Sequence, residues 1–233
     1  MNAQRSSDSV SASSWRSARL FVTDEFAAPP VILRVDDSVI GTLGNFSAST
    51  GKAKSKKTFN VCAIVAAAMT GGTVLNYSAS LPPEKRRILY VDTEQSRFHC
   101  KRVLCRILRL AGLPTDVHPP LLEFLCLRGY ATKERLRKIE EAIYDLDDLG
   151  LVVIDGIRDL AHDINSPGEA TDLITKLMQW TDERRIHIHT VLHLNKGDDN
   201  TRGHLGTELN NKAETVLQIT CLLYTSDAAD DLI

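Results

Sequence analysis

The sequence predicts one α/β domain built on a doubly wound, mainly parallel sheet with helices on both faces. Short apolar runs alternate with segments of helical periodicity along most of the chain, which is the pattern of repeated strand–helix units. Residues 151–154 are continuously apolar, as expected of a strand that is covered on both faces. Hydrophobic residues make up 43% of the 233, so the chain can bury a substantial core.

Local signals give the order of the elements. Asp36 and Asp37 between two β-branched runs indicate a hairpin turn, and Gly71-Gly72 closes the first helical pattern. Thr132 is a candidate cap for a later helix. The expected elements are strands at 31–35 and 38–43, a helix at 58–69, a strand at 87–91, a helix at 96–111 with its apolar residues on one face, a strand at 121–127, a helix at 132–144, a strand at 151–154, a helix at 169–183, a strand at 186–194 and the start of another at 215–219.

The bulk composition excludes several classes of protein. The net charge of -2 gives no overall basic field for nucleic acid, so any such contact needs a local patch or a ring of subunits. The most apolar stretch, residues 61–69, is too short to span a membrane. The cysteines form no C-x-x-C pair and no cluster with histidine, which indicates reduced thiols in a cytoplasmic protein.

The two ends of the chain are expected to lie outside the domain. Residues 1–17 are rich in serine and lack the apolar segment of a signal peptide, so we expect a disordered N-terminus before a core at 18–220. Residues 221–230 match, codon for codon, the translation of a transposase adapter used in short-read library preparation. We therefore interpret 221–233 as a tail that is not native, with a natural polar tail as the alternative.

The segment from Gly51 to Thr58 matches the phosphate-binding P-loop pattern, G-x-x-x-x-G-K-[ST], at all but one position. In such a loop, successive backbone N–H groups surround the β-phosphate and the helix dipole adds to them. Lys57 takes the place of the lysine that reaches the β- and γ-phosphate oxygens, and Thr58 that of the Mg²⁺-binding hydroxyl. The predicted nucleotide-binding residues are Gly51, Lys52, Ala53, Lys54, Ser55, Lys56, Lys57 and Thr58.

Lys56 is the departure from this pattern, because it stands where the second glycine is usual. That glycine permits a backbone geometry that a side chain strains. Against this, Lys52, Lys54 and Lys57 join Lys56 in concentrating positive charge where a triphosphate would bind. On the motif alone, a solvated basic turn is the alternative.

Two apolar strands are followed by acidic residues. Residues 149–154 lead into Asp155, and a carboxylate at the carboxyl end of a buried parallel strand lies beside the ligand crevice of an open α/β sheet. Asp155 is therefore the candidate Mg²⁺ ligand opposite Thr58. Because Gly156 and not a glutamate follows it, a base that activates water must come from elsewhere, and Glu94 follows the second such strand.

These elements together resemble the RecA-like P-loop ATPases of the RepA type, the hexameric replicative helicases of plasmids and mobile elements. Residues 153–166 are similar to that family's acidic-ended strand and Asn-containing loop, and 190–196 to its next strand, which usually ends in His-x-Asn-Lys. Residues 202–219 resemble its Arg-Gly loop and the following strand. The resemblance covers 39–220, and Lys56 bears on the expected hydrolysis rate more than on the fold.

The resemblance implies a RecA-like fold, ATP and Mg²⁺ as ligands, and roles for single residues. Glu94 would orient and deprotonate the attacking water; an exposed loop carboxylate, or a partner of a helix cap at Ser96, is the alternative. His193 would sense the γ-phosphate. Candidates to reach nucleic acid or the ATP of an adjacent subunit, with a solvated loop as the alternative, are Asn195, Lys196, Arg202 and Lys212. Two further histidines, His187 and His189, alternate with isoleucines and are expected at packing or surface positions.

The predicted function is Mg-dependent ATP binding and hydrolysis, coupled to DNA replication or mobilisation by an oligomeric helicase of the RepA type. The partners that the resemblance implies are further copies of the chain, up to a hexamer, and single-stranded DNA or replication and mobilisation proteins, with no membrane. A non-hydrolysing, nucleotide-dependent loader or regulatory module is the alternative, which Lys56 favours and the pair Glu94 and Asp155 disfavours. A small-molecule kinase would need an arginine-rich lid and an acceptor pocket, and the sequence shows a sign of neither.

Overall fold

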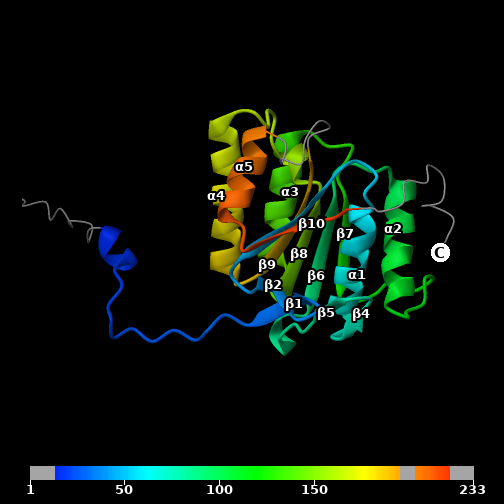
Figure 1. Ribbon diagram of the computed structural model, residues 1–233, viewed down its shortest axis with the longest axis horizontal. Coiled ribbons are helices and arrows are strands. Elements are labelled where there is room, and N and C mark those ends of the chain that lie inside the picture. Colours follow the sequence, from blue (N-terminus) through cyan, green and yellow to red (C-terminus); the bar gives the residue numbers. More distant parts are fainter. Residues whose placement is uncertain (1–13, 195–202, 221–233) are drawn as a thin grey trace, which may run out of the picture.

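The computed structural model describes residues 14–194 and 203–220, in which two β-sheets and helices α1 to α5 form one domain (Figure 1). The predicted α/β class is confirmed. Short 3-10 helices are present at Ser14–Ala18, Pro83–Lys85 and Ile157–Leu160. Within the described ranges, no helix combines the length and apolar character that a membrane crossing requires.

The smaller sheet is antiparallel and has the strand order β2-β1-β5-β4. β1 (Val31–Val35) and β2 (Ser38–Thr42) form the expected hairpin, with Asp36 at a φ of 48° in the turn. β5 (Tyr77–Ala79) pairs with β1, and β4 (Thr73–Val74) pairs with β5. The sequence does not predict β4 and β5, because strands of two and three residues carry too little periodicity to recognise.

The larger sheet is parallel and has the order β10-β3-β9-β8-β6-β7, with β10 and β7 at its edges. Since all its strands run the same way, their carboxyl ends meet at one edge, where open α/β sheets bind their ligands. Its strands are β3 (Phe46–Gly51), β6 (Arg87–Asp92), β7 (Leu122–Cys126), β8 (Leu149–Asp155), β9 (His187–His193) and β10 (Thr215–Gln218).

Helices cover both faces of the larger sheet, as the alternation of residues along its strands requires. Ile88 and Tyr90 of β6 enter one core, with α1 (Lys57–Thr70), α2 (Arg97–Leu110) and the smaller sheet. The residues between and after them, Leu89 and Val91, enter the other core. That second core contains residues of α3 (Thr132–Asp145), α4 (Pro167–Arg184) and α5 (Gly203–Lys212).

The structure differs from the expected elements at three places. The strand before the phosphate loop is β3, whose small polar residues hide it from a search for apolar runs. Thr132 is not the cap of α3, because Ala131 takes that position and its N–H donates to the Glu134 carboxylate at 3.3 Å. α5 forms where the resemblance places part of an Arg-Gly loop, since Leu205 and Leu209, one helical turn apart, are both fully buried.

Candidate nucleotide-binding site

The candidate site lies at the carboxyl ends of four neighbouring strands. β3 ends at Gly51, which is in register with His193 at the end of β9. β8 ends at Asp155, opposite Asp92 at the end of β6, and Glu94 follows β6 by two residues. Parallel pairing therefore brings residues that are far apart in the sequence to a single edge of the sheet.

Lys57 lies inside the phosphate loop at the first turn of α1 and is buried. Its ammonium donates to the carbonyl oxygens of Gly51 at 2.9 Å and Lys52 at 2.8 Å. Burial lowers the pKa of Lys57, whereas the charges of Asp155 and Glu94 raise it. The loop thus surrounds a partly desolvated cation, which is a favourable partner for a phosphate group.

The backbone of the loop explains both its first glycine and its unusual lysine. A Cβ at Gly51 would lie 2.5 Å from the Ile219 carbonyl oxygen and 2.5 Å from Ser55 Oγ, so only glycine fits. Lys56 has φ 63° and ψ 29°, the left-handed conformation for which the pattern normally supplies glycine. Lys54 also has a positive φ, of 65°. Lys56 therefore accepts the loop geometry at a conformational cost of about 1–2 kcal/mol.

Asp155 Oδ2 accepts hydrogen bonds from Thr58 Oγ1 at 3.0 Å and from the Tyr90 hydroxyl at 2.9 Å. Burial raises the pKa of Asp155 to about 6, the charge of Asp92 adds to this effect, and the two hydrogen bonds oppose it. The Tyr90 ring stacks on Phe124 with centroids 4.6 Å apart. Sequence reasoning missed Tyr90, because a tyrosine within an apolar run looks like an ordinary core residue.

The oxygen donors present at this position fit the Mg²⁺ ion that the motif implies. Mg²⁺ is usually held by one or two carboxylates together with nucleotide phosphates and water. The Thr58 hydroxyl and the Asp155 carboxylate supply such oxygens side by side, 3.0 Å apart. Elsewhere in the described part of the chain, no three His, Cys, Asp or Glu side chains come together as a separate metal site.

Glu94 and His193 face one another across the end of the sheet, with Oε1 and Nε2 3.7 Å apart. The imidazole is the strongest influence that lowers the pKa of Glu94, ahead of burial, which raises it. The Glu94 side chain is 42% exposed, so it carries its charge within reach of water. A Cβ at Gly156 would lie 2.9 Å from Glu94 Oε1, and the glycine after Asp155 therefore makes room for this carboxylate.

The backbone that carries Glu94 is fixed from both sides. Asp92 Oδ1 accepts the N–H groups of Glu94 at 3.0 Å and Gln95 at 2.7 Å. The Thr93 hydroxyl lies 2.9 Å from the carbonyl oxygen of Gly156 and 3.0 Å from its N–H group. These contacts hold the loop after β6 against the end of β8, so that the Glu94 position is largely set before any ligand binds.

A buried chain of hydrogen bonds joins β3 to β9 beneath the phosphate loop. Ser47 Oγ lies 2.7 Å from His187 Nε2 and 2.8 Å from His189 Nδ1. Ser49 Oγ lies 2.8 Å from His189 Nε2, and His187 Nδ1 lies 2.8 Å from the Thr42 carbonyl oxygen. Complete burial lowers the pKa of His187 to about 4 and that of His189 to about 3, so both rings are neutral near pH 7.

The partners fix the direction of every bond in this chain. A carbonyl oxygen only accepts, so His187 carries its proton on Nδ1 and its Nε2 accepts from Ser47. Ser47 has no second proton, so His189 donates to it from Nδ1 and accepts from Ser49 at Nε2. Ser47 and Ser49 are two positions apart in the sequence, and so are His187 and His189. This spacing is the signal that places both members of each pair on one face of their strand.

Of the four candidates for contacts in trans or with DNA, the structure places one. Asn195, Lys196 and Arg202 lie outside the described residues. Lys212 is the last residue of α5 and is exposed. Glu214, two residues later, accepts from the Thr42 N–H at 2.9 Å and from the Thr42 hydroxyl at 2.8 Å, next to the end of the buried chain.

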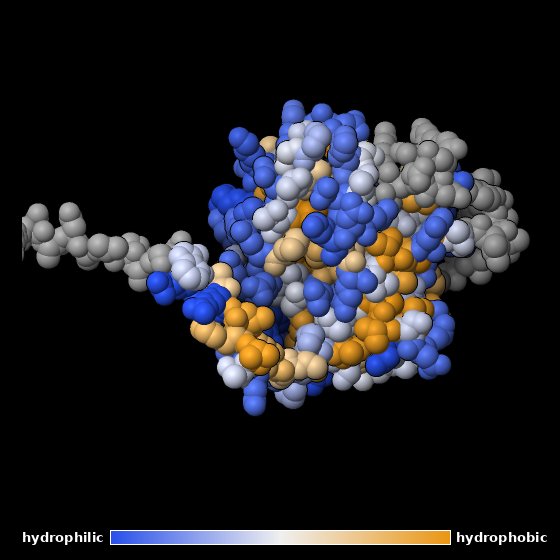
Figure 2. All heavy atoms as spheres, turned by 60° about the vertical axis from the view of Figure 1, so that its left-hand side comes forward, coloured by the Kyte–Doolittle hydropathy of each residue, from blue (hydrophilic) through white to orange (hydrophobic). Residues whose placement is uncertain are grey.

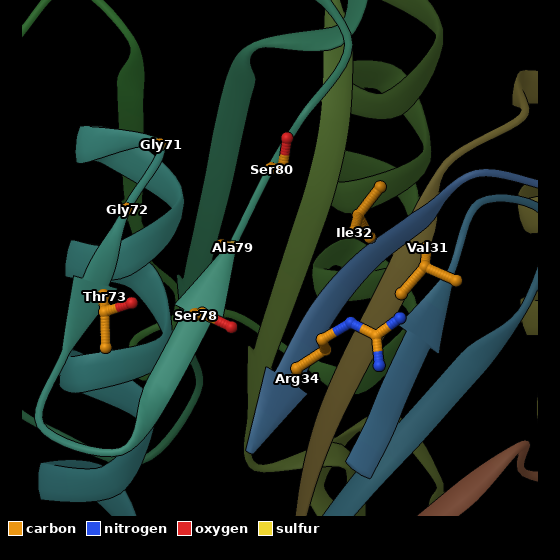
Figure 3. A pocket seen from close by; sticks show the side chains of 9 residues that line it. All are labelled: Val31, Ile32, Arg34, Gly71, Gly72, Thr73, Ser78, Ala79 and Ser80. Atoms are coloured by element: carbon orange, nitrogen blue, oxygen red, sulfur yellow. The ribbon is translucent and has the colours of Figure 1, made fainter. Parts of the chain in front are cut away.

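A pocket of about 290 Å³ lies at the smaller sheet and is lined by residues such as Arg34, Gly72 and Ser78 (Figure 3). Gly72 follows the carboxyl end of α1, whereas the phosphate loop precedes the amino end of the same helix. This pocket therefore belongs to the opposite end of α1 and is separate from the candidate site.

Comparisons with known proteins address the family and the fold. A family model described as an AAA domain matches residues 16–199. The chain belongs to this family. The matched range of the AAA domain contains the phosphate loop and the strands that lead to Glu94, Asp155 and His193.

The fold has a counterpart among solved structures, the crystal structure of the RadB recombinase. The two share 16% sequence identity and a TM-score of 0.50, over 76% of this chain and 75% of that chain. At this identity the likeness concerns the fold alone. A search of curated proteins finds no match. The family is that of the AAA domain, and the fold is a RecA-like α/β fold.

Proposed function

We propose that this AAA-domain protein binds and hydrolyses ATP with Mg²⁺. The observation that carries the proposal is the convergence of Lys57, Thr58, Asp155 and Glu94 at the carboxyl edge of one sheet, with Thr58 and Asp155 in direct contact at 3.0 Å. A cation, a pair of metal ligands and an ionised carboxylate near water are the components that phosphoryl transfer to water requires.

Each side chain has its own task in the proposed reaction. The loop from Gly51 to Thr58 would hold the β- and γ-phosphates through its N–H groups and the Lys57 ammonium. Thr58 and Asp155 would hold Mg²⁺, which neutralises charge on those phosphates when it is bound. Glu94 would orient the attacking water and accept its proton while the γ-phosphoryl group passes from ATP to that water and ADP leaves. His193, next to Glu94, would sense whether the γ-phosphate is present.

The finer function that we propose is ATP hydrolysis coupled to DNA replication or mobilisation, within an oligomer of the RepA type. Its support is the ordered series of segments from 39 to 220 that resembles that family. In this scheme Lys196, Arg202 or Lys212 would supply a cation to the ATP of an adjacent subunit, and Asn195 would contact the nucleic acid.

A nucleotide-dependent loader or regulatory module that does not hydrolyse ATP is the second candidate. Lys56 favours it, because a side chain in the left-handed conformation stands where the usual loop has glycine. Glu94 and Asp155 oppose it, because a module that only binds nucleotide has no need of an ionised carboxylate beside the metal ligands.

Phosphate release from Mg-ATP, with and without single-stranded DNA, tests the proposal. Glu94→Gln keeps the size of the side chain and removes its charge, so turnover should fall by about 100-fold or more. ATP binding, followed with a fluorescent nucleotide, should remain. Glu141→Gln, an exposed position on α3, is the matched control and should leave turnover unchanged.

The outcomes separate the candidates. Turnover that DNA stimulates and Glu94→Gln abolishes supports the nucleic-acid-coupled ATPase. ATP binding without turnover in the unaltered chain favours the regulatory module and removes the role given to Glu94. Transfer of phosphate to a metabolite would indicate a kinase, and absence of ATP binding would contradict every form of the proposal.

A further inference from the structure

An arm, residues 19–30, leaves the domain before β1. In Figure 1 it runs away from the body on the side opposite to α2. Its large apolar side chains face solvent, with exposed fractions of 71% for Leu20, 50% for Phe21, 104% for Val22 and 75% for Phe26. Hydrophobic residues gather in Figure 2 where the arm joins the body. A dense run of exposed aromatic and aliphatic side chains is typical of an interaction surface.

Residues 19–29 of the arm have local order, and Pro30 at its root joins the arm to the domain, because the Pro30 carbonyl oxygen accepts the Leu43 N–H at 3.0 Å. Asp24 Oδ2 accepts the Phe21 N–H at 2.8 Å, and the Asp24 N–H donates to the Phe21 carbonyl oxygen at 3.0 Å. The Arg19 guanidinium lies 4.5 Å from the Phe21 ring centroid. Among the described residues, the hydrogen bonds recorded for 19–29 join them only to the arm or to the 3-10 helix before it. Two prolines at its root stiffen the backbone there.

A cleft of about 600 Å³ opens beside the loop that carries Glu94. The start of α2 forms one wall and the β7–α3 loop forms the other. The second wall is held in place by the Arg135 guanidinium, which donates to the carbonyl oxygens of Leu127, Arg128 and Tyr130 at 3.1, 3.0 and 2.8 Å. The cleft is therefore formed in advance, and it has the size of a site for a small molecule or a few side chains.

The cleft is basic and aromatic. Arg97 on one wall and Arg128 on the other are exposed, and none of the residues that line the cleft is acidic. In the described part of the chain, neither arginine has an ion-pair partner. Lys138 Nζ lies 4.5 Å from the Tyr130 ring centroid and brings a third cation nearby. Phe98, which follows Arg97 on α2, is 69% exposed.

We propose that the arm of one copy of this chain docks in the cleft of a second copy. The acidic pair Asp24 and Glu25 would lie against Arg97 and Arg128, and Phe26 would pack on the Tyr130 ring of the cleft. An extended arm of this length reaches up to about 40 Å. That exceeds the radius of gyration of about 16 Å expected for a domain of this size.

The arm and the cleft are different surfaces on different sides of the domain, so each copy can give one contact and receive another. Such a heterologous contact continues into a ring or a helical filament. A docked arm would also touch Gln95, the neighbour of Glu94, and so connect assembly to hydrolysis. This connection rests on the proposed ATPase function, whereas the docking itself does not.

Sedimentation velocity of the whole chain over the micromolar range tests the docking. Arg97→Glu with Arg128→Glu reverses the charge of the cleft and should weaken self-association by about tenfold or more. Arg109→Glu with Arg137→Glu makes the same change of net charge at the far end of α2 and on α3, and should leave self-association unchanged.

The arm is tested by its own two variants. Phe21→Ser with Phe26→Ser removes the apolar anchors and should also weaken self-association by about tenfold or more. Asp24→Arg with Glu25→Arg should weaken self-association alone, but should restore it in a chain that also carries the reversed cleft. Restoration by a second charge reversal cannot come from a chain that has merely lost its fold.

Three results would overturn the docking: a wild-type chain that stays monomeric, self-association that survives reversal of the cleft, or a combined charge swap that does not restore it. Single-stranded DNA is the other possible occupant of the cleft, and fluorescence anisotropy of labelled DNA with the same variants tests for it. A monomeric wild-type chain whose DNA binding is lost with Arg97 and Arg128 reversed would assign the cleft to nucleic acid. Since sedimentation needs no ATP turnover, failure of the docking and failure of the proposed ATPase are distinguishable.

Discussion

Strands β3 and β9 hold the phosphate side of the candidate site through buried hydrogen bonds, whereas β6 and β8 hold the metal side mainly through apolar packing. The first pair contains the chain from Ser49 through His189 and Ser47 to His187. The second pair is apolar and buried on both faces up to its terminal carboxylates, with Tyr90 and the half-buried Arg87 at the start of β6 as the exceptions. Both pairs are equally inaccessible to solvent, so burial alone does not distinguish them.

The difference lies in what each pair tolerates. Apolar side chains gain from burial in any well-packed arrangement, so small changes of shape are absorbed. Buried hydrogen bonds are directional, and each one that is left unmade costs the full desolvation of its polar group. We therefore infer that β3 and β9 fix the register of the phosphate loop against His193 more strictly than β6 and β8 fix Asp92 against Asp155.

The largest expected effect comes from a substitution at the centre of the hydrogen-bonded strands β3 and β9, the polar pair. Ser47→Ala leaves His187 Nε2 and His189 Nδ1–H buried without a partner, which should lower the free energy of unfolding by about 2–5 kcal/mol. Ile154→Val removes one methylene from the apolar pair and should cost about 1 kcal/mol. Urea unfolding of both variants measures the contrast, and equal losses would contradict the distinction between the two pairs.

The next effect separates the two sides of the site by ligand. Lys57→Ala removes the cation that would bind the phosphates, and should weaken ATP binding by about 3 kcal/mol, or about 100-fold. Asp155→Asn acts on the metal side and should chiefly remove the dependence of ATP binding on Mg²⁺. Isothermal titration with and without Mg²⁺ distinguishes them, and a Lys57→Ala chain that binds ATP normally would remove Lys57 from the site.

The sequence predicts the strands that lead to Asp155 and Glu94 well, because their signals are local. The apolar run that ends in Asp155 and the apolar run before Glu94 each indicate a strand. Each also places the acidic side chain to within a few residues. The turn at Asp36 and the left-handed position of Lys56 follow in the same way, from rules about single backbone conformations.

The polar pair could not be predicted in this way. Ser47 and His189 meet only because β3 lies between β10 and β9. The periodicity of neither segment predicts this strand order. A run of small polar residues buried on both faces also contradicts the usual pattern of a core strand. Gly156 is a similar case, since its closeness to Glu94 depends on the pairing of β6 with β8.

A smaller effect should appear in the pH dependence of stability. His187 and His189 have folded-state pKa values lowered to about 4 and about 3, below the ordinary value of 6.5. Below pH 6.5 the unfolded chain therefore binds protons that the folded chain does not, and stability falls as the pH drops toward 4. Each histidine contributes a slope of up to about 1.4 kcal/mol per pH unit.

His189→Asn removes one of these two groups and should flatten the slope between pH 6 and pH 4 by up to about 1.4 kcal/mol per unit. Thermal or urea unfolding at a series of pH values gives the slope, which does not depend on the absolute stability of the variant. A slope identical to that of the unaltered chain would mean that His189 is protonated in the folded state, against the hydrogen-bond directions derived from the Thr42 carbonyl.

The smallest effect concerns the loop that the polar pair supports. Lys56→Gly removes the Cβ from a residue at φ 63° and should raise the free energy of unfolding by about 0.5–1 kcal/mol, after the greater freedom of glycine in the unfolded chain is counted. Lys56→Ala keeps the Cβ but removes the charge, so it should give no such gain. If both variants are stabilised equally, repulsion among the loop lysines and not backbone conformation sets the cost of Lys56. If only Lys56→Gly is stabilised and its ATP turnover also rises, the presence of a side chain at this left-handed backbone position limits both the stability and the proposed activity of the loop.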